Sequence, residues 1–175
     1  MKLAVDNIFL TGFMGAGKST VAAQLAKQLG WACVDVDKLV EKNAGMSIVK
    51  LFETEGEATF RGKEFQVVAQ VTTASHTVVA LGGGSMVDRD NRERIFRAGV
   101  VVYLKASVDT ILARTKGTPR PMLLGKGKAP KERVEELLGA RKSIYEQANI
   151  HIDTEGKTPE LIAGEILAKL ETWKG

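Results

Sequence analysis

The sequence predicts a three-layer α/β fold built on a parallel sheet and formed as a single domain. Five short apolar runs rich in branched residues occur at 7–12, 32–36, 77–81, 99–104 and 149–153. Helical patterns separate these runs, and their nearly continuous apolarity is typical of strands buried on both faces of a parallel sheet. The chain has 175 residues, which suits one domain with a full core rather than two.

The helices follow from spacing and from cap residues. The segment 18–29 places a set of apolar residues on one stripe, namely Val21, Ala22, Leu25, Ala26 and Leu29. The segment 158–173 opens with a threonine cap and a proline at the first helical position. Ser47 and Ser107 are further candidate caps, so we expect helices to begin after both.

Composition excludes several classes of protein. The net charge is +4, with no long run of one sign and no basic stripe with aromatic residues, so nucleic acid is not an expected partner. No apolar stretch reaches 18 residues, so no membrane span is expected, and the first residues are typical of a strand rather than a signal peptide. The single cysteine, Cys33, is interpreted as a small core residue. These features suit a cytoplasmic protein, with a monomer as the default for one small domain.

A phosphate-binding loop is the strongest motif. "GFMGAGKST" at 12–20 matches G-x-x-x-x-G-K-[ST], and it stands between an expected strand and an expected helix, as the motif requires. Glycines allow backbone N–H groups to surround phosphate oxygens at a helix N-terminus. Lys18 is expected on the β- and γ-phosphates and Ser19 on Mg²⁺. The candidate ATP-binding residues of this loop are Gly12, Gly15, Ala16, Gly17, Lys18, Ser19 and Thr20.

Two aspartates and three glycines follow other strands. Asp35 and Asp37 lie one residue apart in "WACVDVDKLV", so on a strand their side chains would point to the same face. Gly82, Gly83 and Gly84 follow the third apolar run and remove side chains where backbone must approach something closely. Because the ends of parallel strands form the ligand crevice, both groups are expected there, although a plain loop is the alternative for the glycines.

Two arginines occur where apolar residues are expected. In the helix near 57–73, Arg61 falls on a stripe with Ala58, Phe65, Val68, Ala69 and Thr72. In the helix near 132–148, Arg141 falls on a stripe with Val134, Leu137, Leu138, Ile144, Tyr145 and Ala148. A guanidinium on an apolar face must be paired. A shared anionic ligand and an internal salt bridge are both open explanations.

Together these pieces resemble the shikimate kinase family over nearly the whole chain. The resemblance rests on the phosphate loop, "DVD" at 35–37, "FR" at 60–61, "GGG" at 82–84, "RP" at 120–121 and Arg141. It implies a five-stranded parallel sheet like that of the nucleoside monophosphate kinases. It also implies transfer of the ATP γ-phosphate to the 3-hydroxyl of shikimate, giving shikimate 3-phosphate and ADP.

The resemblance also implies site residues. Asp37, Arg61, Gly83 and Arg141 match shikimate-binding positions, and Asp37 would hold the acceptor hydroxyl. Asp35 would hold Mg²⁺ through water or hydrogen-bond Ser19, and Lys18 and Arg120 would neutralise the transferring phosphoryl group. Arg114 and Lys157 lie near adenine-contacting positions, although an arginine is common where Lys157 stands.

Two regions are implied as well. A shikimate-binding region spans about 38–65, and a lid spans about 114–129. The cation-rich stretch 114–132, which is also rich in glycine and proline, favours a mobile loop or lid on composition alone. Its "RPMLL" replaces a leucine that is common in the family with methionine, a conservative change.

Other functions remain possible at this point. A related small-molecule kinase acting on gluconate or a nucleotide would share the phosphate loop. A catalytically silent nucleotide-binding module is an alternative from another class. The release of ADP with a panel of acceptors would separate these functions.

Overall fold

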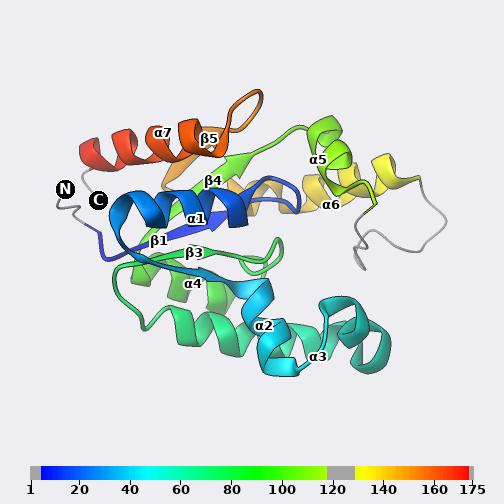
Figure 1. Cartoon of the computed structure of the whole chain (residues 1–175). Helices are drawn as coiled ribbons and strands as arrows, with labels where there is room; N and C mark the ends of the chain where they lie inside the picture. The colour runs from blue at the N-terminus through cyan, green and yellow to red at the C-terminus, as the bar shows by residue number, and fades with distance from the viewer. Residues whose placement is uncertain (1–4, 118–128, 174–175) are drawn as a thin grey trace.

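The computed structural model describes residues 5–117 and 129–173, which form three layers (Figure 1). The strands are β1 (Asn7–Thr11), β2 (Ala32–Asp35), β3 (Thr77–Ala80), β4 (Val100–Lys105) and β5 (Ile150–Asp153). The helices are α1 (Lys18–Leu29), α2 (Val36–Ala44), α3 (Ile48–Val71), α4 (Arg89–Ala98), α5 (Val108–Thr115), α6 (Pro130–Tyr145) and α7 (Pro159–Thr172).

The five strands form one parallel sheet in the order β2-β3-β1-β4-β5. All four pairs are parallel, and the central strand β1 pairs with both β3 and β4. The predicted α/β fold with a parallel sheet is therefore confirmed. In a parallel sheet all strands end at the same edge, so the segments that follow β1, β2 and β3 meet there.

Alternate residues of the buried strands supply two cores, one on each face of the sheet. On one face Ile8, Leu10 and Val102 pack with α1 and α7. On the other, Phe9 and Val101 pack with residues of α2 to α6. Figure 1 shows α1 and α7 together on one side of the sheet and α3 and α4 on the other. Strands covered on both faces have no solvated side, which explains their continuous apolarity.

Strand β2 departs from the expectation of burial. It lies at the edge of the sheet, and Ala32 and Cys33 are exposed while Val34 and Asp35 are half-buried. The interpretation of Cys33 as a core residue is therefore wrong. The apolar character of a short run does not reveal whether its strand has one neighbour or two.

The helix predicted near 57–73 is the second part of a longer helix. Helix α3 begins at Ile48 and is broken at Gly56, whose φ of 81° lies outside the helical region. The side chains of Ser47, Ser107 and Thr158 accept hydrogen bonds from backbone N–H groups three residues on, so these predicted caps are confirmed.

Within the described ranges, no helix has both the length and the apolarity needed to span a bilayer. Residues 118–128, which include Arg120 and most of the predicted lid, lie outside the described residues.

Candidate active site

The phosphate loop connects β1 to α1. Gly17 stands immediately before the helix with φ 92° and ψ 14°, a left-handed conformation that glycine adopts without steric cost. The Nζ of Lys18 donates to the carbonyl oxygens of Gly12 (2.8 Å) and Phe13 (3.0 Å). The ammonium therefore lies over the loop, at the N-terminus of a 12-residue helix, which is where a phosphate would be stabilised.

A cavity of about 280 Å³ opens over this loop and contains both aspartates. Its lining residues are Met14, Gly15, Gly17, Lys18, Ser19, Thr20, Asp35, Asp37, Leu81, Gly83 and Arg114. The Lys18 ammonium and the Ser19 and Thr20 hydroxyls thus share one space with the two carboxylates. Phosphate oxygens, a divalent cation and an acceptor hydroxyl are the groups that suit such a lining.

The two aspartates line this cavity for a different structural reason from the one predicted. Asp35 is the last residue of β2 and also the N-cap of α2, where its Oδ1 accepts from the backbone N–H of Lys38 at 3.1 Å. Asp37 lies in the first turn of α2. Strand alternation is therefore the wrong reason for their common direction. The turn from strand into helix brings both carboxylates to the cavity.

A second cavity, of about 440 Å³, lies next to the first. Its lining residues are Glu57, Arg61, Glu64, Phe65, Gly84, Val87, Asp88, Asn91, Ala140 and Arg141. Both predicted arginines line it, one from α3 and one from α6. Helices far apart in the sequence thus present two guanidinium groups to one space, and the glycine run separates this space from the phosphate loop.

Arg141 is buried and has no anionic partner in the part of the chain that the structure describes. Only 7% of the residue is exposed. Its Nη1 donates to the Gly83 carbonyl at 3.0 Å, and its guanidinium lies 5.8 Å from the centroid of the Phe13 ring. A buried guanidinium without a carboxylate is costly. Of the two explanations left open by the sequence, this residue favours an anionic ligand.

Arg61 is paired internally. Its Nη1 donates to Glu64 at 2.6 Å and its Nη2 to Glu57 at 3.4 Å, and its side chain is 32% exposed. The predicted stripe is only partly correct: Val68 is buried, but Ala58 is exposed and the buried face also carries Phe60 and Glu64. The guanidinium has five N–H donors, so this pairing leaves donors for a ligand in the second cavity.

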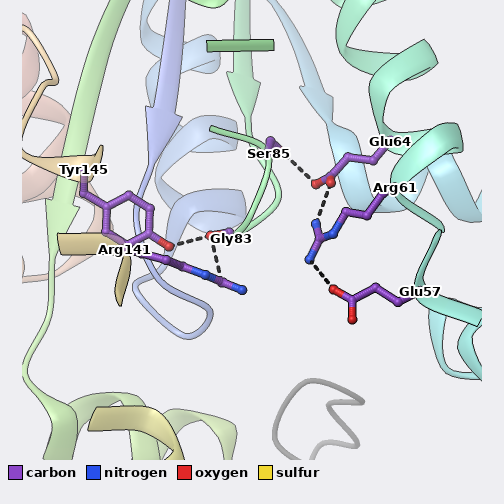
Figure 2. Close-up of polar contacts among 7 residues, drawn as sticks. All are labelled: Glu57, Arg61, Glu64, Gly83, Ser85, Arg141 and Tyr145. Carbon is purple, nitrogen blue, oxygen red and sulfur yellow. Dashed lines mark hydrogen bonds and ion pairs between the residues drawn. The ribbon is translucent and has the colours of Figure 1, made fainter. Parts of the chain in front are cut away.

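The glycine run lies where these side chains converge, as Figure 2 shows. A Cβ placed on Gly82 would lie 2.5 Å from Glu64 Oε1 and 2.7 Å from Asp37 Oδ1. A Cβ on Gly84 would lie 2.7 Å from Arg61 Nη1. The run therefore lacks side chains because three charged groups already occupy the space around it.

A third cavity, of about 270 Å³, lies on the other side of the phosphate loop. Its lining residues are Ala16, Gly17, Thr20, Val21, Arg114, Lys157, Pro159 and Ile162. Arg114 donates to the Gly15 carbonyl at 3.3 Å, and Lys157 pairs with Glu165 at 2.8 Å. Backbone, aliphatic stems and two cations make this space suitable for the base of a nucleotide whose phosphates occupy the loop.

Comparison with known proteins decides the family. The sequence profile of shikimate kinase matches residues 14–171. The chain is 42% identical to the shikimate kinase of Thermodesulfovibrio yellowstonii, over 95% of this chain and 96% of that protein. The chain belongs to the shikimate kinase family. The resemblance predicted from the motifs is confirmed, and with it the ATP-dependent phosphorylation of shikimate as the activity of the family.

Comparison with solved structures supports the same family. The shikimate kinase from Acinetobacter baumannii, determined in complex with shikimate, superposes with a TM-score of 0.92 at 36% identity, over 97% of this chain and 94% of that chain. A gluconokinase from Sinorhizobium meliloti has a TM-score of 0.58 at 18% identity, over 95% and 92% of the two chains. The second similarity shows the fold alone, so it does not revive the alternative of a gluconate kinase.

Most of the predicted site residues line three cavities of this fold, whereas Gly12 and Gly82 line none of the three. Lys18, Ser19, Asp35 and Asp37 share the first, Arg61 and Arg141 the second, and Arg114 and Lys157 the third. Arg120 lies outside the described residues.

Sequence reasoning missed two residues of the site. Glu64 is 2% exposed, and its Oε1 accepts from the Ser85 hydroxyl at 2.6 Å. Tyr145 is 1% exposed and donates to the Gly83 carbonyl. Helical spacing could have identified Glu64 as a buried residue, because it stands four residues after Phe60 and three before Val67 on the buried face. The position of Tyr145 on the apolar stripe predicted only an ordinary core residue.

Proposed function

We propose that the protein transfers the γ-phosphate of ATP to the 3-hydroxyl of shikimate, giving shikimate 3-phosphate and ADP. The observation that carries this proposal is the Arg141 guanidinium, which is buried, lines the second cavity and pairs with no carboxylate among the residues described. A planar carboxylate is the ligand that a guanidinium binds with two parallel hydrogen bonds. Shikimate combines such a carboxylate with a hydroxyl acceptor.

The phosphate side of the reaction uses the loop. Lys18 would leave the carbonyls of Gly12 and Phe13 for the β- and γ-phosphate oxygens of ATP, and its charge would offset the charge of the transferring group. Arg114 and Lys157 would border the adenine in the third cavity. From the sequence alone, Arg120 would add a second positive charge over the phosphates.

A magnesium ion fits the donor set of the first cavity. The Ser19 hydroxyl and the Asp35 carboxylate are hard oxygen donors, and Mg²⁺ commonly takes one or two protein oxygens together with phosphates and water. In the described ranges no group of three or more His, Cys, Asp and Glu side chains is placed to hold a metal ion. When bound, the ion would neutralise part of the negative charge on the phosphates.

The acceptor side uses Asp37 and the two arginines. Arg141 and Arg61 would bind the shikimate carboxylate, which would direct the ring toward the glycine run. Asp37 lines the adjoining cavity, where it would orient the 3-hydroxyl and accept its proton. The distance between the reacting groups would then be set by the helices that carry these side chains and by the loop at 82–84, which has no side chains.

The assembly and location of the enzyme are also proposals. Among the described residues only Val87 and Leu161 are large apolar side chains with high exposure, which supports a monomer. We propose a cytoplasmic enzyme whose partners are ATP and shikimate.

The test is ADP release with a panel of acceptors. Shikimate, gluconate and nucleoside monophosphates are each offered with ATP and Mg²⁺, with a reaction lacking acceptor as the baseline. Shikimate alone should raise ADP release well above baseline, and the product should carry its phosphate on the 3-oxygen in phosphorus NMR. Equal release with any acceptor, or faster release with gluconate, would overturn the proposal.

A further inference from the structure

The Gly83 carbonyl accepts two hydrogen bonds from one helix. Arg141 Nη1 donates from 3.0 Å, and the Tyr145 hydroxyl donates as well (Figure 2). Both donors lie on α6, four residues apart, so their side chains leave the same face of the helix. A carbonyl oxygen has two lone pairs, and these two donors use both.

The two donors differ in whether the substrate carboxylate would need them. Arg141 lines the second cavity, where the proposed function requires its N–H groups to bind a carboxylate. Any movement of Nη1 toward that carboxylate takes a donor away from Gly83. Tyr145 lines none of the three cavities, so its hydrogen bond can persist while the acceptor binds.

The surroundings of Tyr145 hold its hydroxyl in place. The residue is 1% exposed, and its ring stacks on Tyr103 with centroids 5.1 Å apart and planes at 30°. Tyr103 in turn makes an edge contact with His151 at 5.8 Å. Burial raises the pKa of Tyr145 to about 12, outweighing the opposing effect of the Arg141 charge, so the hydroxyl keeps its proton over the working pH range.

We propose that Tyr145 is a positioning residue for the acceptor, because its hydroxyl satisfies the Gly83 carbonyl and thereby releases Arg141 to bind the substrate carboxylate. This inference rests on the proposed function. Without the hydroxyl, Arg141 would be the only donor to Gly83 among the described contacts. A guanidinium that turned toward an acid would then leave the carbonyl without a partner, and one that stayed would bind the acid only with its other N–H groups. Leaving a buried acceptor unpaired is costly.

The first experiment compares Tyr145→Phe with Tyr103→Phe. Tyr103→Phe is the matched control, since it removes a hydroxyl from the same stacked pair but from a ring that donates nothing to Gly83 among the described contacts. Tyr145→Phe should raise the KM for shikimate roughly tenfold, which corresponds to about 1.4 kcal/mol. The KM for ATP should stay within about twofold, and Tyr103→Phe should leave both constants near the wild-type values.

A structural role alone would give another pattern. Loss of packing would change both KM values together, or would lower the melting temperature without changing either. Either result, or an unchanged KM for shikimate, would overturn the inference. In the Arg141→Lys background, Tyr145→Phe should have a much smaller effect on the shikimate KM, because the residue it releases is gone. Fully additive effects would also overturn the inference.

A second measurement keeps the hydroxyl and does not depend on the folding of Tyr145→Phe. The chain has two tyrosines, so 3-fluorotyrosine in the Tyr103→Phe protein labels Tyr145 alone. Saturation with shikimate should move its fluorine resonance, whereas ADP with Mg²⁺ should not, and the reverse would refute the role. If the wild-type protein transfers no phosphate to shikimate, the proposed function fails; if it does and Tyr145→Phe behaves as wild type, only this inference fails.

Discussion

The ion pair between Arg61 and Glu64 lies beside the second cavity, and it can be tested by changing one atom of the buried Glu64 carboxylate. Glu64→Gln keeps the shape of the side chain but removes its charge. The amide oxygen can still accept from Arg61, and the amide nitrogen can donate to the Ser85 hydroxyl, which can accept. The variant therefore isolates the charge of the pair from its hydrogen bonds.

The magnitude follows from burial. Removing one partner of a fully buried ion pair costs roughly 3–5 kcal/mol. Here the Glu64 side chain is 3% exposed but that of Arg61 is 32% exposed, and Arg61 retains Glu57 at 3.4 Å. Water and Glu57 therefore compensate part of the loss, so we expect a destabilisation of about 2 kcal/mol. For a chain of this size that corresponds to a fall in Tm of roughly 4–8 °C.

The assay is thermal unfolding followed by circular dichroism without substrates, because a bound ligand would add its own stabilisation. Glu57→Gln is the matched control, since it removes a charge that contacts the same guanidinium from a side chain that is 55% exposed. It should change stability by no more than about 0.5 kcal/mol. Equal falls in Tm for the two variants, or a more stable Glu64→Gln protein, would refute the reasoning.

Two other changes test the site, and a third tests the pH dependence of stability at an exposed carboxylate. Asp37→Asn should lower kcat by about two orders of magnitude or more while the Kd for ATP stays near the wild-type value, because the amide cannot accept a proton. Arg141→Lys should raise the KM for shikimate by more than tenfold, since an ammonium cannot form the planar pair with a carboxylate. Glu155 accepts from the Ser107 N–H and the Thr110 hydroxyl, both at 2.7 Å, and these bonds lower its pKa. Glu155→Gln should therefore melt earlier than wild type above pH 5, and the difference should shrink as the pH falls through the native pKa.

Each of these three predictions has a contradicting outcome. An Asp37→Asn protein with full turnover would exclude Asp37 as the proton acceptor. A shikimate KM that is unaltered in Arg141→Lys would remove that residue from the site. The sign for Glu155 follows from its lowered pKa: the deprotonated form is favoured by folding, so its stabilisation is complete above the unfolded pKa and disappears in acid. A melting difference that grows below pH 4 would contradict this assignment.

The features that depend on local spacing were predictable from the sequence. The phosphate loop carries its own context, because a strand, a glycine turn and a helix follow one another within a few residues. The caps at Ser47, Ser107 and Thr158 are equally local, since each bonds to an N–H three residues later. The strand order is not local, and the exposure of β2 depends on it.

The partners of the two arginines mark the limit of helical patterning. Arg141 was placed correctly on the buried face of α6, where it lies with Val134 and Tyr145. The buried face of α3 was misjudged by about one residue, so Arg61 was placed on it and Glu64 was overlooked. Successive helical positions differ by 100°, and in a helix with polar residues on most sides a small error in phase exchanges a buried residue for its neighbour.

The edge position of β2 has a consequence for the chemical reactivity of the protein. Cys33 is the only cysteine of the chain and is exposed. Partial burial of the thiol, and then the negative charge of Asp35, raise the pKa of Cys33 above its ordinary value. This raised pKa lowers the fraction of the nucleophilic thiolate at neutral pH. Accessible but protonated, Cys33 should resist oxidation at neutral pH and react with maleimide or iodoacetamide mainly in alkaline buffer, as a single labelling point on the strand that leads to Asp35 and Asp37.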